Sequence, residues 1–197
     1  FDRLKASDGR LLRVPQEEFC QALSVPPTRK YNNDGGPGIR ECLGLLAGSD
    51  YAEKDRLAFL KAQIVFWLIA ATDGHAKNFS LFLTPGGRYR MTPLYDIMSL
   101  QPNYAAKQLR RKEFRVSMAV GDNRNYAVES ILPYHFLEDA KAVGMAQDQV
   151  RELFASLGEI AESAFERTVA TMPDDFPQHL AQQIGDSIRK RSAKLLN

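Results

Sequence analysis

The sequence has 197 residues, of which 44% are hydrophobic, 10% aromatic and 25% charged, which excludes a disordered chain, a collagen and a disulfide-rich miniprotein. The formal net charge is only +2, so no overall field indicates nucleic acid or a membrane surface as a partner. Two cysteines, Cys20 and Cys42, are too few for a cysteine-based zinc site, and we expect reduced thiols in a cytoplasmic protein.

Residues 1–14 predict two short strands around the turn pair Asp8-Gly9. Residues 15–23 predict a helix, because Pro15 and the two acids after it suit a first helical turn. The glycines of residues 32–38 indicate a loop; no Gly-Lys-Ser/Thr follows them, as a phosphate-binding loop would require.

The centre of the chain predicts a short helix over residues 39–47 and a long one over 54–71. From Ile64 onward the long helix is apolar on nearly every side, so we expect it to form the core. Residues 79–83 and 88–92 predict a hairpin with a four-residue loop.

Residues 99–112 are predicted to be irregular and basic, and residues 113–120 to pair with 126–128. Apolar spacing predicts a helix over 150–169, and Pro177 opens a last one. The most apolar stretch is far shorter than the roughly 20 residues that span a bilayer. The polar start carries no signal peptide and no initiating Met, so the sequence reads as part of a longer protein.

The chemistry-bearing residues are Asp73, Asn78 and Asp96. Asp73 follows the buried helix and Asn78 begins the hairpin. If the hairpin pairs Leu83 with Arg88, Asp96 returns to within roughly 10 Å of Asn78 along the strand direction. We therefore expect the three side chains to converge at the open end of the hairpin.

Two carboxylates and an amide oxygen suit magnesium that carries phosphates. The spacing Asp-x4-Asn, with an Asp about twenty residues later, is that of a protein-kinase catalytic loop and its metal-binding Asp. His75, two residues after Asp73, instead matches the Asp-x-His-x-x-Asn of phosphoinositide-type kinases. The alternative is that Asp73 and Asn78 only cap turns.

The segments around these residues closely resemble HipA-type toxin kinases. They are TDGHAKNFSLF, YRMTPLYDI, PQEEFCQAL, PPTRKY and DGGPGI, followed more weakly by LPYHFLEDAK and TMPDDFP. The resemblance implies that residues 1–197 form the C-terminal lobe of a protein-kinase-like fold, mainly α (α+β) with small hairpins. It also implies that Asp73 is the catalytic base and that Asn78 and Asp96 bind Mg²⁺.

The same resemblance implies an ATP-dependent serine/threonine kinase toxin that acts on a translation component such as glutamyl-tRNA synthetase. It implies a HipB-like, DNA-binding antitoxin as partner, contact with DNA only through that antitoxin, and no membrane. The N-terminal nucleotide-binding lobe of such kinases has no counterpart in this sequence, so we expect the chain alone to lack activity. The rival hypothesis is an inactive, kinase-derived module that binds an antitoxin or repressor.

Other polar residues have two interpretations each. His75 either orients Asp73, touches phosphate or bonds backbone, and Lys77 either contacts a phosphate or is solvated; we place both on the nucleotide side. A basic run after Asp96 is either a substrate segment or a solvated face: Lys107, Arg110, Arg111, Lys112 and Arg115. A second group near the C-terminus favours the helix dipole over DNA contact: Arg189, Lys190, Arg191 and Lys194.

Overall fold

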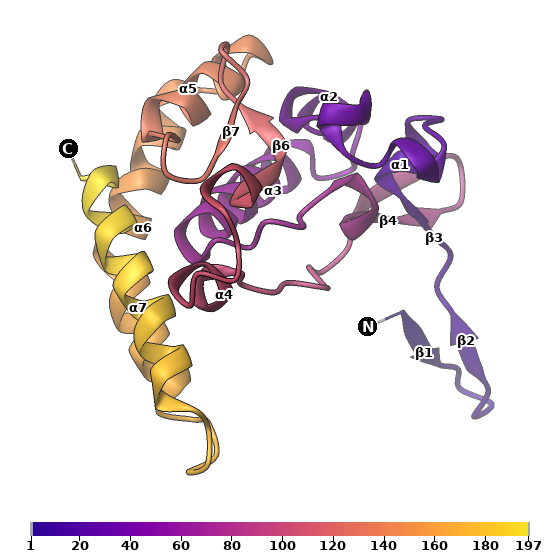
Figure 1. Ribbon diagram of the computed structural model, residues 1–197. Coiled ribbons are helices and arrows are strands. Elements are labelled where there is room, and N and C mark those ends of the chain that lie inside the picture. Colours follow the sequence, from indigo (N-terminus) through magenta and orange to yellow (C-terminus); the bar gives the residue numbers. More distant parts are fainter. Residues whose placement is uncertain (1, 197) are drawn as a thin grey trace.

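A long buried helix, α3 (Ala52–Ile69), runs through the centre of the fold in the computed structural model, which describes residues 2–196 (Figure 1). Ile64, Trp67 and Leu68 on this helix are each at most 2% exposed. The indole Nε1 of Trp67 donates to the carbonyl of Val128 at 3.0 Å, so this buried donor is paired. The predicted core is therefore confirmed.

The fold is mainly helical with three small antiparallel sheets, as predicted. The other helices are α1 (Phe19–Ala22), α2 (Ile39–Leu46), α4 (Gln101–Ala105), α5 (Pro133–Ala142), α6 (Gln147–Val169) and α7 (Gln178–Ser192). The strands are β1 (Arg3–Lys5), β2 (Leu11–Arg13), β3 (Gln16–Glu18), β4 (Ser80–Thr84), β5 (Arg88–Met91), β6 (Arg115–Val120) and β7 (Asn125–Ala127). The sheets are β1-β2, β3-β4-β5 and β6-β7.

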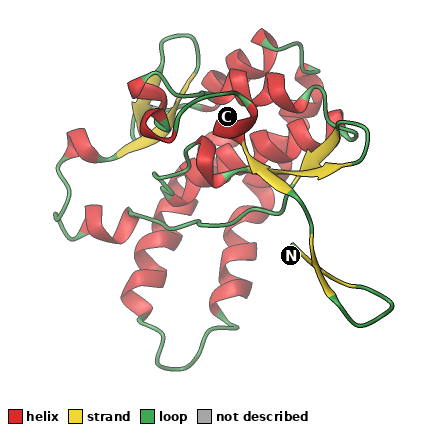
Figure 2. Ribbon diagram, turned by 90° about the vertical axis from the view of Figure 1, so that its right-hand side faces the viewer, coloured by secondary structure: helices red, strands yellow, loops and turns green. Residues whose placement is uncertain are grey.

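Two regions project from the central helices. The antiparallel pair α6 and α7 forms one long arm, and the β1-β2 hairpin extends on another side (Figure 2). In β1 and β2 every residue is exposed. The predicted N-terminal hairpin and the predicted C-terminal helices are thus confirmed, but only the helices contribute to the core.

The helix predicted over residues 15–23 is wrong in its first half. Gln16–Glu18 forms β3 and pairs with β4, with Gln16 opposite Phe82 and Glu18 opposite Ser80; the helix α1 follows it. The acids of this segment matched a helix N-terminus locally. The edge of the distant hairpin instead binds their backbone, a tertiary contact that overrides local propensity.

The β4-β5 hairpin exists as predicted, but its register differs by one residue. Leu83 pairs with Tyr89, and Thr84 with Arg88, so the loop contains Pro85-Gly86-Gly87 rather than four residues. Gly86 and Gly87 both have positive φ, which lets this shorter loop close. The predicted register is therefore wrong.

The segment 99–112 is not wholly irregular, since it contains α4 and a 3-10 turn at Arg111–Glu113. The strands β6 and β7 pair as predicted. Within residues 2–196, none of the helices has the length and apolar character that crossing a membrane requires. Cys20 and Cys42 are buried and free, and burial raises the pKa of both thiols.

Candidate functional site

The loop after α3 brings the Asp73 carboxylate to the surface. The helix ends where Ala70 adopts a left-handed conformation, with φ 52°. Beyond it, Gly74 lies so close to Phe66 that an added Cβ would stand 2.5 Å from the ring atom Cδ2, so only glycine allows this approach. The Asp73 side chain, by contrast, is 56% exposed. The loop is fixed on the core while its carboxylate faces outward.

Tyr31 and His75 surround the Asp73 carboxylate. The Tyr31 hydroxyl donates to Asp73 Oδ1 at 3.0 Å, and the Tyr31 ring meets the His75 ring edge-on with centroids 5.2 Å apart. His75 Nε2 lies 3.9 Å from the same oxygen, which is too far for a hydrogen bond. Tyr31, rather than His75, therefore orients the carboxylate.

His75 is buried, and its imidazole is neutral near pH 7. Burial lowers the pKa of its imidazole, and Lys30 lowers it further, whereas Asp73 and Asp96 oppose the shift. Its Nδ1 atom is buried and has no hydrogen-bond partner. A neutral ring below the carboxylate adds no positive charge that would repel a magnesium ion.

Asn78 is held by the loop that carries Asp73. The side-chain Nδ2 of Asn78 donates to the backbone carbonyl of Asp73 at 3.0 Å, and the residue is only 6% exposed. Because this bond engages the amino side of the amide, the amide oxygen is the atom left to coordinate a cation.

Asp96 is positioned by the residues on either side of it. It adopts a left-handed conformation with φ 56°, which Asp tolerates better than most residues. The preceding Tyr95 donates to the carbonyl of Lys77 at 3.0 Å and shares a 2.6 Å hydrogen bond with Ser80. On the other side, Leu100 N–H donates to the carbonyl of Ala70 at 2.9 Å. Both anchors tie the Asp96 segment to the Asp73 loop.

The structure brings the two carboxylates together. Asp73 and Asp96 line the same small cavity of about 30 Å³, with Phe66, Gly74 and Met98 among its other walls. A space of this size accommodates an ion or a water.

The donor set fits magnesium. Within residues 2–196, no three His, Cys, Asp or Glu side chains gather into a metal-binding group. Mg²⁺ is ordinarily held by one or two carboxylates together with phosphate oxygens and water. Asp96 and the amide oxygen of Asn78 would supply the protein part of such a shell.

Lys77 faces an acidic residue of β3. Its Nζ is 3.8 Å from Glu18 Oε2 on β3, so its charge is shared with that acid. Much of the basic run is similarly engaged: Arg110 pairs with Glu113, Arg111 with Glu129, and Arg115 stacks over Tyr126.

A search of protein families gives one decisive match. Residues 1–165 match the model of the HipA-like C-terminal domain. The chain belongs to the HipA-like C-terminal domain family. Its resemblance to HipA-type proteins, inferred from the sequence motifs, is thereby confirmed.

Two curated relatives share this HipA-like region. Y4mE of Sinorhizobium fredii, provisionally named a kinase, is 39% identical over 125 residues, covering 62% of this chain and 30% of the relative. HipA of Shewanella oneidensis, named a serine/threonine-protein kinase toxin, is 27% identical over 160 residues, covering 75% of this chain and 35% of the relative. The aligned region thus spans about a third of each relative.

A solved structure matches the whole HipA-like fold. It is the Shewanella oneidensis toxin–antitoxin complex of HipA, HipB and operator DNA, with a TM-score of 0.84 and 21% identity. The match covers 100% of this chain and 47% of that one. At this identity the likeness establishes the fold.

Sequence reasoning missed two residues that organise the HipA-like site. Tyr31 orients Asp73 from a segment far away in sequence, and no spacing rule links the two. Arg191 was assigned to the helix dipole, yet it is only 8% exposed and donates to the carbonyl of Leu68 and to Gln101 Oε1, both at 2.9 Å. Arg191 therefore joins the end of α3 to the segment after Asp96.

Proposed function

We propose that the protein containing this domain transfers the γ-phosphoryl group of ATP to a serine or threonine hydroxyl of another protein. The observation that carries the proposal is the shared cavity of Asp73 and Asp96, with Asn78 bonded to the Asp73 backbone. Phosphoryl transfer needs mainly a group that receives the hydroxyl proton and ligands that hold metal-bound phosphates. These three residues fit those roles.

Asp73 acts as the general base in this proposal. Its exposed carboxylate accepts the proton of the incoming hydroxyl as the oxygen forms a bond to the γ-phosphorus. The bond between that phosphorus and the β–γ bridging oxygen breaks, and ADP leaves with the bridging oxygen. The Tyr31 hydrogen bond occupies one carboxylate oxygen and leaves the other for the substrate hydroxyl.

Asn78 and Asp96 hold magnesium in this proposal. The metal, when bound, neutralises phosphate charge and keeps the phosphoryl group in line for attack. Neutral His75 lies next to the Asp73 carboxylate, and Lys77 lies on the β3 side of the phosphates. His75 and Lys77 thus lie next to the bound nucleotide without coordinating the metal.

The proposal extends to partners. We infer a toxin–antitoxin role with a HipB-like, DNA-binding antitoxin in the cytoplasm, and a translation component, such as glutamyl-tRNA synthetase, as substrate. Support comes from the Shewanella relative, which is named a serine/threonine-protein kinase toxin, and from the presence of HipB and operator DNA in the matching structure.

The test is transfer of labelled γ-phosphate from ATP by the full-length gene product in the presence of Mg²⁺. Label on a serine or threonine of a bacterial translation protein, lost in Asp73→Asn, supports the proposal. Antitoxin binding with no transfer to any protein contradicts it and favours the inactive binding module.

A further inference from the structure

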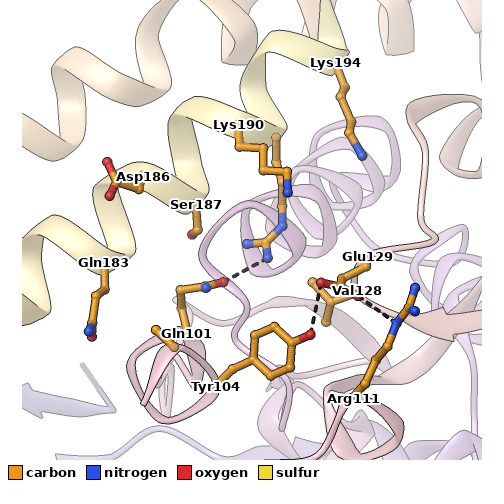
Figure 3. Close-up of a pocket in the computed structure, with 12 residues that line it drawn as sticks. Gln101, Tyr104, Arg111, Val128, Glu129, Gln183, Asp186, Ser187, Lys190 and Lys194 are labelled. Atoms are coloured by element: carbon orange, nitrogen blue, oxygen red, sulfur yellow. Dashed lines mark hydrogen bonds and ion pairs between the residues drawn. The ribbon is translucent and has the colours of Figure 1, made fainter. Parts of the chain in front are cut away.

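A pocket of about 510 Å³ lies between α4, α7 and the residues that follow β7. Figure 3 shows Lys190 on α7 and Lys194 just beyond its end, with Tyr104 and Arg111 on the opposite wall of this pocket. Its volume is within the range of roughly 300–1,000 Å³ that small-molecule sites occupy. The pocket is distinct from the smaller cavity between Asp73 and Asp96.

The acids of this pocket are already neutralised. Glu129 accepts a hydrogen bond from the Tyr104 hydroxyl at 3.0 Å and pairs with Arg111 at 2.9 Å. Asp186 pairs with Arg189 at 3.1 Å. Each carboxylate therefore already has a cationic partner, and Arg189 is shared between Asp186 and Glu162.

The remaining cations have no carboxylate within ion-pair distance in the described part of the chain. Lys190, Lys194 and Arg191 line the pocket, and none of them forms an ion pair with a carboxylate of residues 2–196. Lys190 lies on α7, and Lys194 lies on the 3-10 turn Ala193–Leu195 that follows it. Three positive charges thus converge on one concave surface.

The buried charge of Arg191 is energetically unfavourable when the pocket holds no anion. It is 8% exposed, and its hydrogen-bond partners, the Leu68 carbonyl and Gln101, are both neutral. Burial lowers the pKa of its guanidinium to about 10 even though the charge of Glu129 opposes the shift, which reflects the unfavourable transfer of the Arg191 charge from water. An anion in the pocket would offset this cost.

We propose that this pocket binds a small phosphate-bearing anion, held by Lys190, Lys194 and the positive field of Arg191, with the Tyr104 hydroxyl on the opposite wall. The proposal does not depend on phosphoryl transfer at Asp73. Arg191 bonds to Leu68, which precedes Asp73 in the chain, and to Gln101, which follows Asp96. The anion therefore binds next to the two segments that carry these carboxylates.

The test is calorimetric titration of the protein with inorganic pyrophosphate and, separately, adenosine monophosphate. EDTA and constant chloride concentration suppress metal-dependent binding and ionic-strength differences. We expect a dissociation constant below ~1 mM for at least one probe. The double variant Lys190→Gln/Lys194→Gln should weaken it at least ~10-fold, because each lysine loses a charge-assisted contact.

Two controls make the outcome decisive. Lys54→Gln/Lys61→Gln removes the same charge from exposed positions on α3 and should leave affinity unchanged. Asp73→Asn/Asp96→Asn should also bind as the unaltered protein does. Similar pyrophosphate and monophosphate affinities would indicate recognition of phosphate itself, whereas tighter monophosphate binding would indicate a nucleotide; either supports the site. The proposal is overturned if neither probe binds, or if the two lysine double variants lose affinity equally. It is also overturned if the aspartate double variant loses affinity.

Discussion

The N-terminal hairpin has a regular backbone and exposed side chains, whereas the Asp73 loop has an irregular backbone and mostly buried residues. In β1 and β2 the leucines reach 74% exposure at Leu11. In residues 71–78, only Asp73 is exposed and only Lys77 is half-buried. Regular hydrogen bonding and burial in the core are therefore separate properties of this chain.

Tertiary contacts, rather than local hydrogen bonding, hold the Asp73 loop in position. A two-stranded hairpin alone is marginally stable in water, so its hydrogen bonds position little else. The Asp73 loop instead receives hydrogen bonds from distant segments, including Ser117 Oγ to the carbonyl of Thr72 at 2.7 Å. A functional carboxylate held by tertiary contacts stays within the narrow geometry that chemistry requires.

Removing the charge of either carboxylate should have the largest effect. In the full-length gene product, Asp73→Asn should lower kcat by ~10²–10⁴ with little change in KM for ATP, because it removes the base and keeps the shape. Asp96→Asn should weaken Mg-ATP binding as well, and higher magnesium should partly restore its rate by mass action. A magnesium titration of phosphoryl transfer measures both.

Asp174→Asn, on an exposed loop, is the matched control and should change neither parameter. If magnesium rescues Asp73→Asn and not Asp96→Asn, the two assigned roles are reversed.

Core and hairpin leucines should differ in their contribution to folding. Leu68→Ala should cost about 2–5 kcal/mol of unfolding free energy, since Leu68 is 2% exposed and its loss leaves a cavity. Leu11→Ala, in the hairpin, should cost less than ~0.5 kcal/mol. Urea melts followed by fluorescence of the buried Trp67 compare them, and equal costs would mean that the hairpin is part of the core.

The Tyr31 bond should matter for rate more than for binding. Tyr31→Phe removes the donor to Asp73 and should lower kcat about 3- to 10-fold with KM for ATP unchanged, as the loss of one hydrogen bond implies. Tyr51→Phe, at an exposed tyrosine, serves as control. An equal loss of kcat in both variants would contradict a role of Tyr31 in positioning Asp73.

His75 should produce the smallest effect, visible in the pH dependence of stability. Burial holds its pKa below the ordinary 6.5, so the unfolded chain takes up the proton first and stability falls as pH drops below about 6.5. His75→Asn should lose less stability on acidification from about pH 7 to 5. Metal-free urea melts measure the difference.

Burial raises the pKa of Asp139, which acts in the opposite direction but equally in both proteins. An equal loss of stability in wild type and His75→Asn would therefore contradict a buried, neutral His75.

Local patterns predicted α2, α3, α6 and α7, because apolar periodicity along a helix depends on near neighbours in sequence. The candidate site was also predictable in part. The spacing of Asp73, Asn78 and Asp96 around a hairpin specifies their approach, and the structure places Asp73 and Asp96 on one cavity.

The sequence by itself thus predicted the family, the central helix and the two carboxylates that share one cavity. Only the tertiary structure decided that Gln16–Glu18 forms a strand, that Tyr31 holds Asp73, and that Arg191 is buried behind the site. Each of these depends on a contact between segments far apart in the chain. Such contacts are set by how the helices and sheets pack, which no short-range pattern encodes.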